Sequence, residues 1–139
     1  MEEKMAIKIV IGTKEGKTHQ KELSEEQSTA LHGKKISEKL SGSEIGFEGY
    51  EFEITGGSDN SGTPMRRDVE GDSKARIFAV EGVGIKRARH GNKQRKTVSG
   101  NTISHQTSQL NVKILKEGKD PLTPPAEEKT EEKTEEKKE

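Results

Sequence analysis

The sequence contains no cysteine and no tryptophan among its 139 residues, and its aromatic side chains are few. Without cysteine the chain forms no disulfide, holds no cysteine-ligated zinc and offers no thiol nucleophile. No apolar run approaches the roughly 20 residues that a membrane-spanning helix needs. The segment MEEKMAIKIVIG also lacks the apolar stretch of a secretion signal, so we expect a cytoplasmic protein without a membrane partner. The aromatic residues are Phe47, Tyr50, Phe52 and Phe78.

Apolar residues are scarce as well, at 25% of the chain, whereas charged residues make up 36%. This composition is close to that of chains that cannot bury enough apolar surface to fold. One small domain with tails fits the length, and its core is too modest for a large enzyme cleft. A core of this size often gains stability from a partner that binds only the folded state.

Charge is balanced overall, with 25 basic and 25 acidic side chains, but it is unevenly distributed along the chain. Every arginine lies between Arg66 and Arg95, and no acid occurs between Glu81 and Glu117. This concentration of basic residues favours an anionic partner for the second half of the domain. The numbers of basic and acidic side chains are 8 and 11 in residues 1–55, 10 and 5 in 56–100, and 7 and 9 in 101–139.

Short segments rich in β-branched residues predict a mainly β domain. The segment YEFEIT alternates cleanly, so Tyr50, Phe52 and Ile54 are expected to share one buried face. A turn at Gly16 is expected to join the first two strands in a hairpin. The predicted strands are residues 6–11, 18–23, 50–55, 75–80 and 110–115, with a further short strand within 34–49. Together they predict a small, mainly antiparallel, β-barrel-like domain with one short helix.

The segment SEEQSTALHG carries the clearest helix signal. Ser24 is expected to cap the first turn, with the side chain of Gln27 returning a hydrogen bond to its backbone. Gly33 is expected to end the helix. The side chains expected to face the core are those of Leu23, Ala30 and Leu31.

The composition changes after Gly118, where PLTPPAEEKTEEKTEEKKE combines prolines with a repeat of glutamate and lysine. Such low-complexity, highly charged segments do not bury a core, so we expect residues 120–139 to be a disordered tail. Residues 1–119 are then the β domain, within which we define residues 83–107 as the basic arm.

The stretch ITGGSDNSGTPMRR, residues 54–67, is open to several interpretations. A tight turn is favoured because its glycines permit positive φ and its proline stiffens the exit. A phosphate-binding loop is disfavoured because no GK[ST] follows and no helix pattern begins there. A calcium loop is disfavoured because Asp59 is the only carboxylate in the stretch.

The same stretch resembles a family signature, that of the archaeal and eukaryotic type of small-subunit ribosomal protein S-six. The fixed positions of that pattern are met by Gly56, Gly57, Asp59, Gly62, Pro64 and Met65. The similarity continues in MRRDVEG, in GVGIKRARHGNKQRKTVSGNTIS and in LNVKILKEG, and it covers residues 5–119. The resemblance implies a structural protein of the small ribosomal subunit with a small β-barrel-like fold. It also implies ribosomal RNA and neighbouring ribosomal proteins as partners.

The basic arm indicates RNA binding independently of the family resemblance, because six cations occur within the eleven residues from Lys86 to Lys96. Its glycines and amides are typical of a loop that lies along phosphates. A solvated basic loop is the alternative. The few aromatics argue against base stacking, so we expect contacts to the RNA backbone. The acids Asp68 and Glu70 are alternative partners for Arg66 and Arg67. The expected RNA-binding residues are Arg66, Arg67, Lys86, Arg87, Arg89, Lys93, Arg95 and Lys96.

Catalytic and metal sites have weaker support. The four histidines are scattered, without the spacing of a helical zinc site, and no G-x-S-x-G elbow occurs. Glu51 and Glu53 share one face of a predicted strand, which fits a water-facing surface better than a paired-carboxylate site. We therefore expect no enzyme activity, cofactor, metal or DNA partner. The alternative function is a non-ribosomal module whose acidic β face and tail contact a protein.

Overall fold

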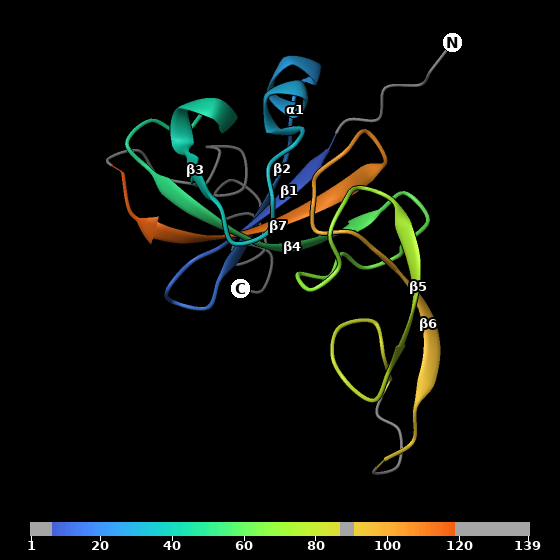
Figure 1. The fold of residues 1–139 in the computed structure, drawn as a ribbon. Helices are drawn as coiled ribbons and strands as arrows, with labels where there is room; N and C mark the ends of the chain where they lie inside the picture. The colour runs from blue at the N-terminus through green and yellow to red at the C-terminus, as the bar shows by residue number, and fades with distance from the viewer. Residues whose placement is uncertain (1–6, 87–90, 119–139) are drawn as a thin grey trace, which may run out of the picture.

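The computed structural model describes residues 7–86 and 91–118, and seven strands, one α-helix and one short 3-10 helix lie within them (Figure 1). Five strands form one sheet in the spatial order β2–β1–β7–β4–β3, and β5 and β6 form a separate hairpin. The strands are β1 (Lys8–Gly12), β2 (Thr18–Glu22), β3 (Lys39–Ser41), β4 (Glu51–Asp59), β5 (Lys74–Ala79), β6 (Gln94–Ser99) and β7 (Thr107–Lys116). The helices are α1 (Glu25–Leu31) and the 3-10 helix η1 (Gly42–Ile45).

The mainly β fold with one α-helix is confirmed. All strand pairs are antiparallel except β1 and β7, which run parallel at the centre of the sheet. Within the described ranges β2 and β3 each have a single neighbour, so the sheet is barrel-like in size and curvature but not closed. The predicted first hairpin is present, with Lys8 opposite Glu22 and Gly12 opposite Thr18.

The core lies on one face of the five-stranded sheet. Alternate residues of β4 and β7 face each other, with Phe52 opposite Ile114 and Ile54 opposite Val112. Leu31 of α1 and Ile45 of η1 are fully buried against this face, and Figure 1 shows both helices lying over it. Burying each such side chain contributes about 1.5–3 kcal/mol. The core residues are Ile7, Ile9, Ile11, Leu23, Leu31, Leu40, Ile45, Tyr50, Phe52, Ile54, Met65, Ile103, Leu110, Val112 and Ile114.

The helix begins as the sequence predicts but buries one unexpected residue. The backbone N–H of Ser24 donates to Oε1 of Gln27 at 3.2 Å, which is the predicted return bond of the capping box. Ala30 is exposed, contrary to expectation, and Ser28 is buried in its place. Ser28 is tolerated there because its hydroxyl donates to the Ser24 carbonyl oxygen at 2.9 Å.

The predicted end of the helix agrees with the structure. Gly33 follows the last turn with φ +86°, a left-handed conformation that favours glycine. The helix has seven residues, and among residues 7–86 and 91–118 no helix is long and apolar enough to cross a membrane. The predicted disorder of 120–139 lies outside the described residues.

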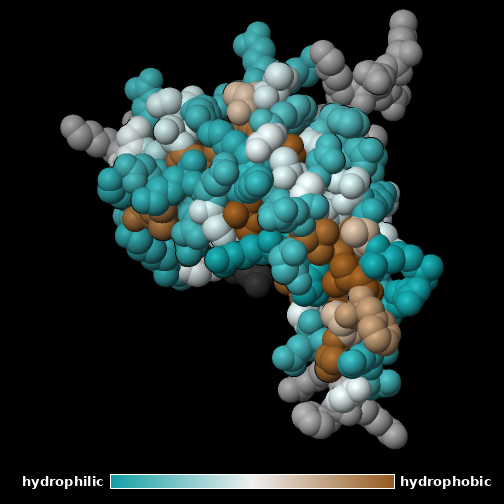
Figure 2. Space-filling model, in the orientation of Figure 1, coloured by the Kyte–Doolittle hydropathy of each residue, from teal (hydrophilic) through white to brown (hydrophobic). Residues whose placement is uncertain are grey.

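The hairpin of β5 and β6 projects from the body formed by the five-stranded sheet and its helices (Figure 1). β6 lies inside the basic arm, which we expected to be a loop, so part of that arm is strand. Residues 83–107 were read as loop because β6 is mostly exposed and shows no apolar alternation. Figure 2 shows a largely hydrophilic body, with apolar side chains gathered over the hairpin and its junction with the body.

Candidate nucleic-acid interface

The first part of the signature stretch is strand, not turn. Gly56 and Gly57 lie inside β4, where they pair with Asn111 and Leu110 of β7. A Cβ atom on Gly57 would lie 2.4 Å from the carbonyl oxygen of Gln109 and 3.1 Å from Sδ of Met65. Glycine is therefore required at position 57 for close approach of two chain segments, and not for the positive φ that the sequence suggested.

The predicted turn occupies the middle of the stretch. The amide of Gly62 donates to the Asp59 carbonyl at 2.8 Å, and the amide of Asp59 donates to the Thr63 carbonyl at 2.9 Å. Gly62 has φ +75°, which explains the glycine there. The chain then returns beside β4, since the amide of Met65 donates to the Gly57 carbonyl at 2.9 Å.

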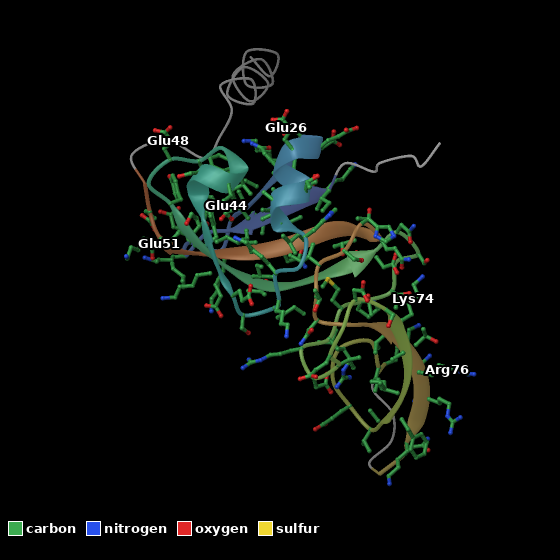
Figure 3. All side chains as sticks on the ribbon, turned by 45° about the horizontal axis from the view of Figure 1, so that its top comes forward. Glu26, Glu44, Glu48, Glu51, Lys74 and Arg76 are labelled. Atoms are coloured by element: carbon green, nitrogen blue, oxygen red, sulfur yellow. The ribbon has the colours of Figure 1, made fainter. Side chains whose placement is uncertain are left out.

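Asp59 ties this turn to the hairpin. Its side chain is almost completely buried, at 2% exposed, and Nζ of Lys74 in β5 lies 3.0 Å from Oδ2. Lys74 also donates to Oγ of Ser61 at 2.7 Å. Figure 3 shows Lys74 at the body end of the hairpin, with Arg76 farther along it. The fixed aspartate of the signature thus holds the strand that carries the cations.

The C-terminal end of the signature stretch, residues 64–66, pairs with the end of β6. Met65 bridges to Ser99, the amide of Ser99 donates to the Pro64 carbonyl at 2.9 Å, and the amide of Arg66 donates to the Ser99 carbonyl at 3.0 Å. Met65 itself is 3% exposed and belongs to the core. The stretch therefore joins the sheet to the base of the hairpin through backbone hydrogen bonds.

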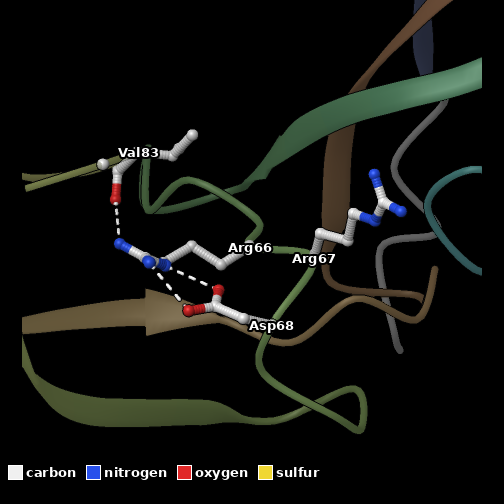
Figure 4. Close-up of a pocket in the computed structure, with 5 residues that line it drawn as sticks. Arg66, Arg67, Asp68 and Val83 are labelled. Atoms are coloured by element: carbon white, nitrogen blue, oxygen red, sulfur yellow. Dashed lines mark hydrogen bonds and ion pairs between the residues drawn. The ribbon is translucent and has the colours of Figure 1, made fainter.

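Arg66 and Arg67 are adjacent in sequence but differ in environment (Figure 4). The guanidinium of Arg66 donates to both carboxylate oxygens of Asp68, from Nε at 2.8 Å and from Nη2 at 2.7 Å. Its Nη1 donates to the carbonyl of Val83 at 2.9 Å. Arg67 is exposed and points away from this cluster. Together with Gly82 these residues line an open surface pocket of about 480 Å³.

The ion pair changes the pKa values of both partners. The hydrogen bonds from Arg66 lower the pKa of Asp68 below its ordinary value, and those to Asp68 raise the pKa of Arg66. The predicted pairing of Arg66 with Asp68 is thus confirmed. The guanidinium of Arg66 is engaged within the protein, so it has no free pair of donors for an external ligand.

The remaining predicted RNA-binding residues lie on or beside the hairpin. Lys86, Lys93, Arg95 and Lys96 are all exposed. Arg95 faces Phe78 across the hairpin and Lys96 faces Ile77, so the two cations point to opposite faces of it. Arg87 and Arg89 lie outside the described residues.

Three further residues of the hairpin escaped the sequence analysis as candidates. Lys74, Arg76 and Phe78 alternate along β5 and are exposed, whereas the residues between them are half-buried. This alternation could have identified them from the sequence, because it predicts a strand whose solvent-facing side carries cations and which directly precedes the basic arm.

The opposite end of the molecule is acidic. Figure 3 shows Glu26, Glu44, Glu48 and Glu51 around α1, η1 and the start of β4, away from Lys74 and Arg76. Several body acids are paired with lysines: Glu44 with Lys34, Glu53 with Lys113 at 3.0 Å and Glu51 with Lys116 at 2.7 Å. The hydrogen bond from Lys116 lowers the pKa of Glu51.

These pairs make Glu51 and Glu53 part of a water-facing strand surface, as the sequence analysis favoured. Over residues 7–86 and 91–118 the structure brings together no group of three or more histidine, aspartate or glutamate side chains able to hold a metal ion.

Comparison with known proteins agrees with this arrangement. The family described as ribosomal protein S6e matches the chain over residues 7–126. The chain is 44% identical over 119 residues to the small ribosomal subunit protein eS6 of Methanococcus maripaludis, covering 85% of this chain and 94% of that one. It is 43% identical over 118 residues to the eS6 protein of Methanothermobacter thermautotrophicus, covering 85% and 93%. The eS6 protein of Natronomonas pharaonis is 37% identical over 112 residues, covering 81% and 87%.

The matched region includes the signature turn, the hairpin and every described residue of the basic arm. Because this match spans most of the chain, the resemblance seen in residues 54–67 is confirmed at the level of the whole domain: the chain belongs to the ribosomal protein S6e family.

Proposed function

We propose that this protein is a structural, non-enzymatic constituent of the small ribosomal subunit in the cytoplasm, where it binds ribosomal RNA and lies beside other ribosomal proteins. The family match supports the assembly. The structure supports the RNA-binding surface, which we assign to the basic arm, residues 83–107, together with the adjoining arginines. The two lines of support are independent, because the surface is argued from charge and geometry alone.

The observation that carries the RNA-binding proposal is a difference in how cations are paired. Three lysines of the body sheet are paired with acids: Lys8 with Glu22 at 3.2 Å, Lys113 with Glu53 at 3.0 Å and Lys116 with Glu51 at 2.7 Å. In the described part of the chain, no carboxylate lies within ion-pair distance of Arg76, Arg95 or Lys96. Unneutralised cations gathered on a projecting hairpin are suited to phosphates.

The proposed RNA contacts come from one end of the molecule. Arg67 and the exposed cations of the hairpin present donors to the RNA backbone, and arginine forks onto two phosphate oxygens where lysine acts as a point charge. Arg66 contributes its charge while its donors hold the connection in place. The proposed RNA-binding residues are Arg66, Arg67, Lys86, Arg87, Arg89, Lys93, Arg95 and Lys96, and the structure adds Arg76.

Sedimentation of cell lysate through a sucrose gradient tests the assembly. We expect the chain to migrate with the small subunits at moderate salt and to leave them after nuclease treatment. A chain that stays at the top of the gradient would overturn the ribosomal proposal.

Binding of purified full-length protein to ribosomal RNA, measured across a range of salt concentrations, tests the surface. If five or six cations meet phosphates, log affinity falls with log salt at a slope of roughly −4 to −5. A flat response to salt would overturn the electrostatic interface and leave the subunit assignment to the sedimentation experiment.

A further inference from the structure

Phe78 is an aromatic residue that the core does not use. It is 63% exposed, the highest value among the exposed large hydrophobic residues in the described part of the chain. The other aromatics pack together near the start of β4, where Tyr50 stacks on Phe52 with ring centroids 5.7 Å apart and Phe47 contacts both. A chain with so few aromatic side chains leaves one of them in water, at a position where it adds little to folding.

The strand register surrounds this ring with cations. Phe78 lies opposite Arg95, and Arg76, two residues before it, lies opposite Thr97. Because cross-strand partners and alternate residues share a face, these side chains form one surface, which we call the outer face of the hairpin. Nζ of Lys93 lies 5.7 Å from the ring centroid of Phe78, and Cζ of Arg95 lies 5.9 Å from it.

The inner face of the hairpin is partly covered by the chain itself, although Lys96 on this face is exposed. Its residues Ala75, Ile77 and Ala79 are half-buried, and Val98, opposite Ala75, is fully buried. A Cβ atom on Gly84 would lie 3.2 Å from Cγ1 of Val98, so the segment after β5 crosses this face. The outer face is the more open of the two, because its β5 residues Lys74, Arg76 and Phe78 are exposed.

The charge of the outer face selects its occupant. An apolar surface of a protein partner would have to bury the cations around the ring, and burying unpaired charge is costly. The outer face needs a partner with an apolar surface for the ring and negative charge for the cations. An RNA strand has both, because a base offers a flat apolar surface and its flanking phosphates offer negative charge. Both cation distances to the ring are close to the 6 Å limit of cation–π contacts, so these contacts leave the exposed ring surface available.

We propose that Phe78 is a stacking platform for one unpaired base of an RNA strand, with Arg76 and Arg95 holding the phosphates beside that base. The proposal rests on the RNA-binding function proposed above and adds a ligand of defined chemistry, an unstacked nucleobase. It revises the sequence-based expectation that this protein contacts only RNA backbone. One exposed ring is enough for a single base, although it is not enough for an extended single-strand reader.

The experiment measures the affinity of the full-length protein for three RNA probes at one fixed salt concentration. The probes are a short single strand of adenosines, a strand of equal length that keeps ribose and phosphate but lacks bases, and an RNA duplex of equal length. The variants are Phe78→Leu, which removes the ring, and Phe78→Tyr, which keeps it. The matched control is Val80→Ala, because Val80 is also exposed, at 37%, but has no ring and lies outside the basic arm.

Stacking makes a specific prediction for the three probes. The Phe78→Leu variant binds the adenosine strand about 5- to 100-fold more weakly than the wild-type protein does. The same variant binds the abasic strand and the duplex within about twofold of wild type. Phe78→Tyr and Val80→Ala bind all three probes as the wild-type protein does. Because Phe78 is exposed, circular dichroism and the unfolding midpoint of Phe78→Leu should match those of the wild type.

Other outcomes overturn the proposal in distinguishable ways. Equal binding of the adenosine strand by wild type and Phe78→Leu would remove the base-stacking role and leave the RNA-binding function standing. Unchanged RNA binding together with loss of Phe78→Leu from assembled small subunits would assign the ring to a protein contact. If the wild-type protein bound none of the probes, the electrostatic interface would fail together with the stacking platform.

Discussion

Gly57 of β4 lies so close to Gln109 of β7 that a Cβ atom on the glycine would be 2.4 Å from the carbonyl oxygen of Gln109. The neighbouring Gly56 has no atom within 4 Å of the corresponding position. Two adjacent glycines of one signature therefore have different physical requirements, and a pair of substitutions separates them.

We expect Gly57→Ala to lower the free energy of unfolding by about 1–3 kcal/mol, because β4 and β7 must move apart to admit the methyl group. Gly56→Ala is the matched control, and its stability should be unchanged or raised by up to about 1 kcal/mol. Urea unfolding of both variants gives the comparison. Equal stabilities would show that the close approach of the two strands is not what requires glycine at position 57.

The ion pair between Arg66 and Asp68 predicts a dependence of stability on pH. The pKa of Asp68 is lowered from its ordinary value of 3.8 by hydrogen bonds from Arg66. The pair therefore stabilises the fold above the ordinary pKa, and this contribution is lost as the pH falls through the lower pKa of the folded state. Arg66 stays charged throughout this range, so Asp68 alone sets the transition.

Asp68→Asn should lower the free energy of unfolding by about 0.2–1 kcal/mol near neutral pH, since Asp68 is 62% exposed and solvent screens the pair. The difference from wild type should shrink as the pH falls below the ordinary pKa of 3.8. Thermal unfolding at several pH values measures it. If the difference in unfolding free energy between wild type and Asp68→Asn stayed the same in acid, the substitution would act through altered packing or hydrogen bonding and not through the lost charge.

Arg66 and Arg67 should differ in their contributions to stability, although both are proposed to contribute charge to RNA binding. Arg67→Gln removes an exposed cation, so we expect unchanged stability and a salt slope of RNA binding that is smaller by about 0.7–0.9. Arg66→Gln breaks the hydrogen bonds to Asp68 and Val83, so we expect a loss of about 1 kcal/mol in unfolding free energy. Salt titrations and urea unfolding of both variants provide the test, which fails if the two arginines behave alike.

The pairing of Lys74 with Asp59 should hold the hairpin to the body. Lys74→Met leaves the buried carboxylate of Asp59 without its cation, and we expect it to cost about 1–3 kcal/mol. Arg76→Met on the same face of β5 should change stability by less than about 0.5 kcal/mol. Amide hydrogen exchange should show faster exchange in β5 and β6 of the Lys74 variant alone. Similar exchange in both variants would contradict a structural role for the ion pair.

Much of the fold could be predicted because the relevant signals are local. Strict alternation in YEFEIT indicated which side of β4 is buried, and Phe52 and Ile54 are indeed fully buried. Ser24 and Gln27 marked the start of α1, and the hydrogen bond between them is formed. Each of these features depends on residues a few positions apart, whose backbone geometry fixes their relative positions.

The errors came from contacts between distant segments. Ala30 was expected to be buried, but α1 packs on the sheet with Ala30 exposed and Ser28 buried. Strand β6 was read as part of a loop because its own sequence shows no apolar alternation, and its pairing with β5 could not be foreseen from local signals. The glycines at 56 and 57 were read as a turn because a strand that needs close approach and a turn that needs positive φ both use glycine.

The sequence by itself determined the family, the mainly β class, the helix boundaries and the basic character of one half of the domain. These properties follow from residue types at short spacing and from the distribution of charge. Tertiary structure alone decided that Arg66 also donates to the Val83 carbonyl while Arg67 points away from this cluster. It likewise decided that Asp59 holds Lys74 and that Phe78 lies among cations on the outer face. The reason is physical: whether a polar or aromatic side chain is available depends on which distant segment the fold brings against it.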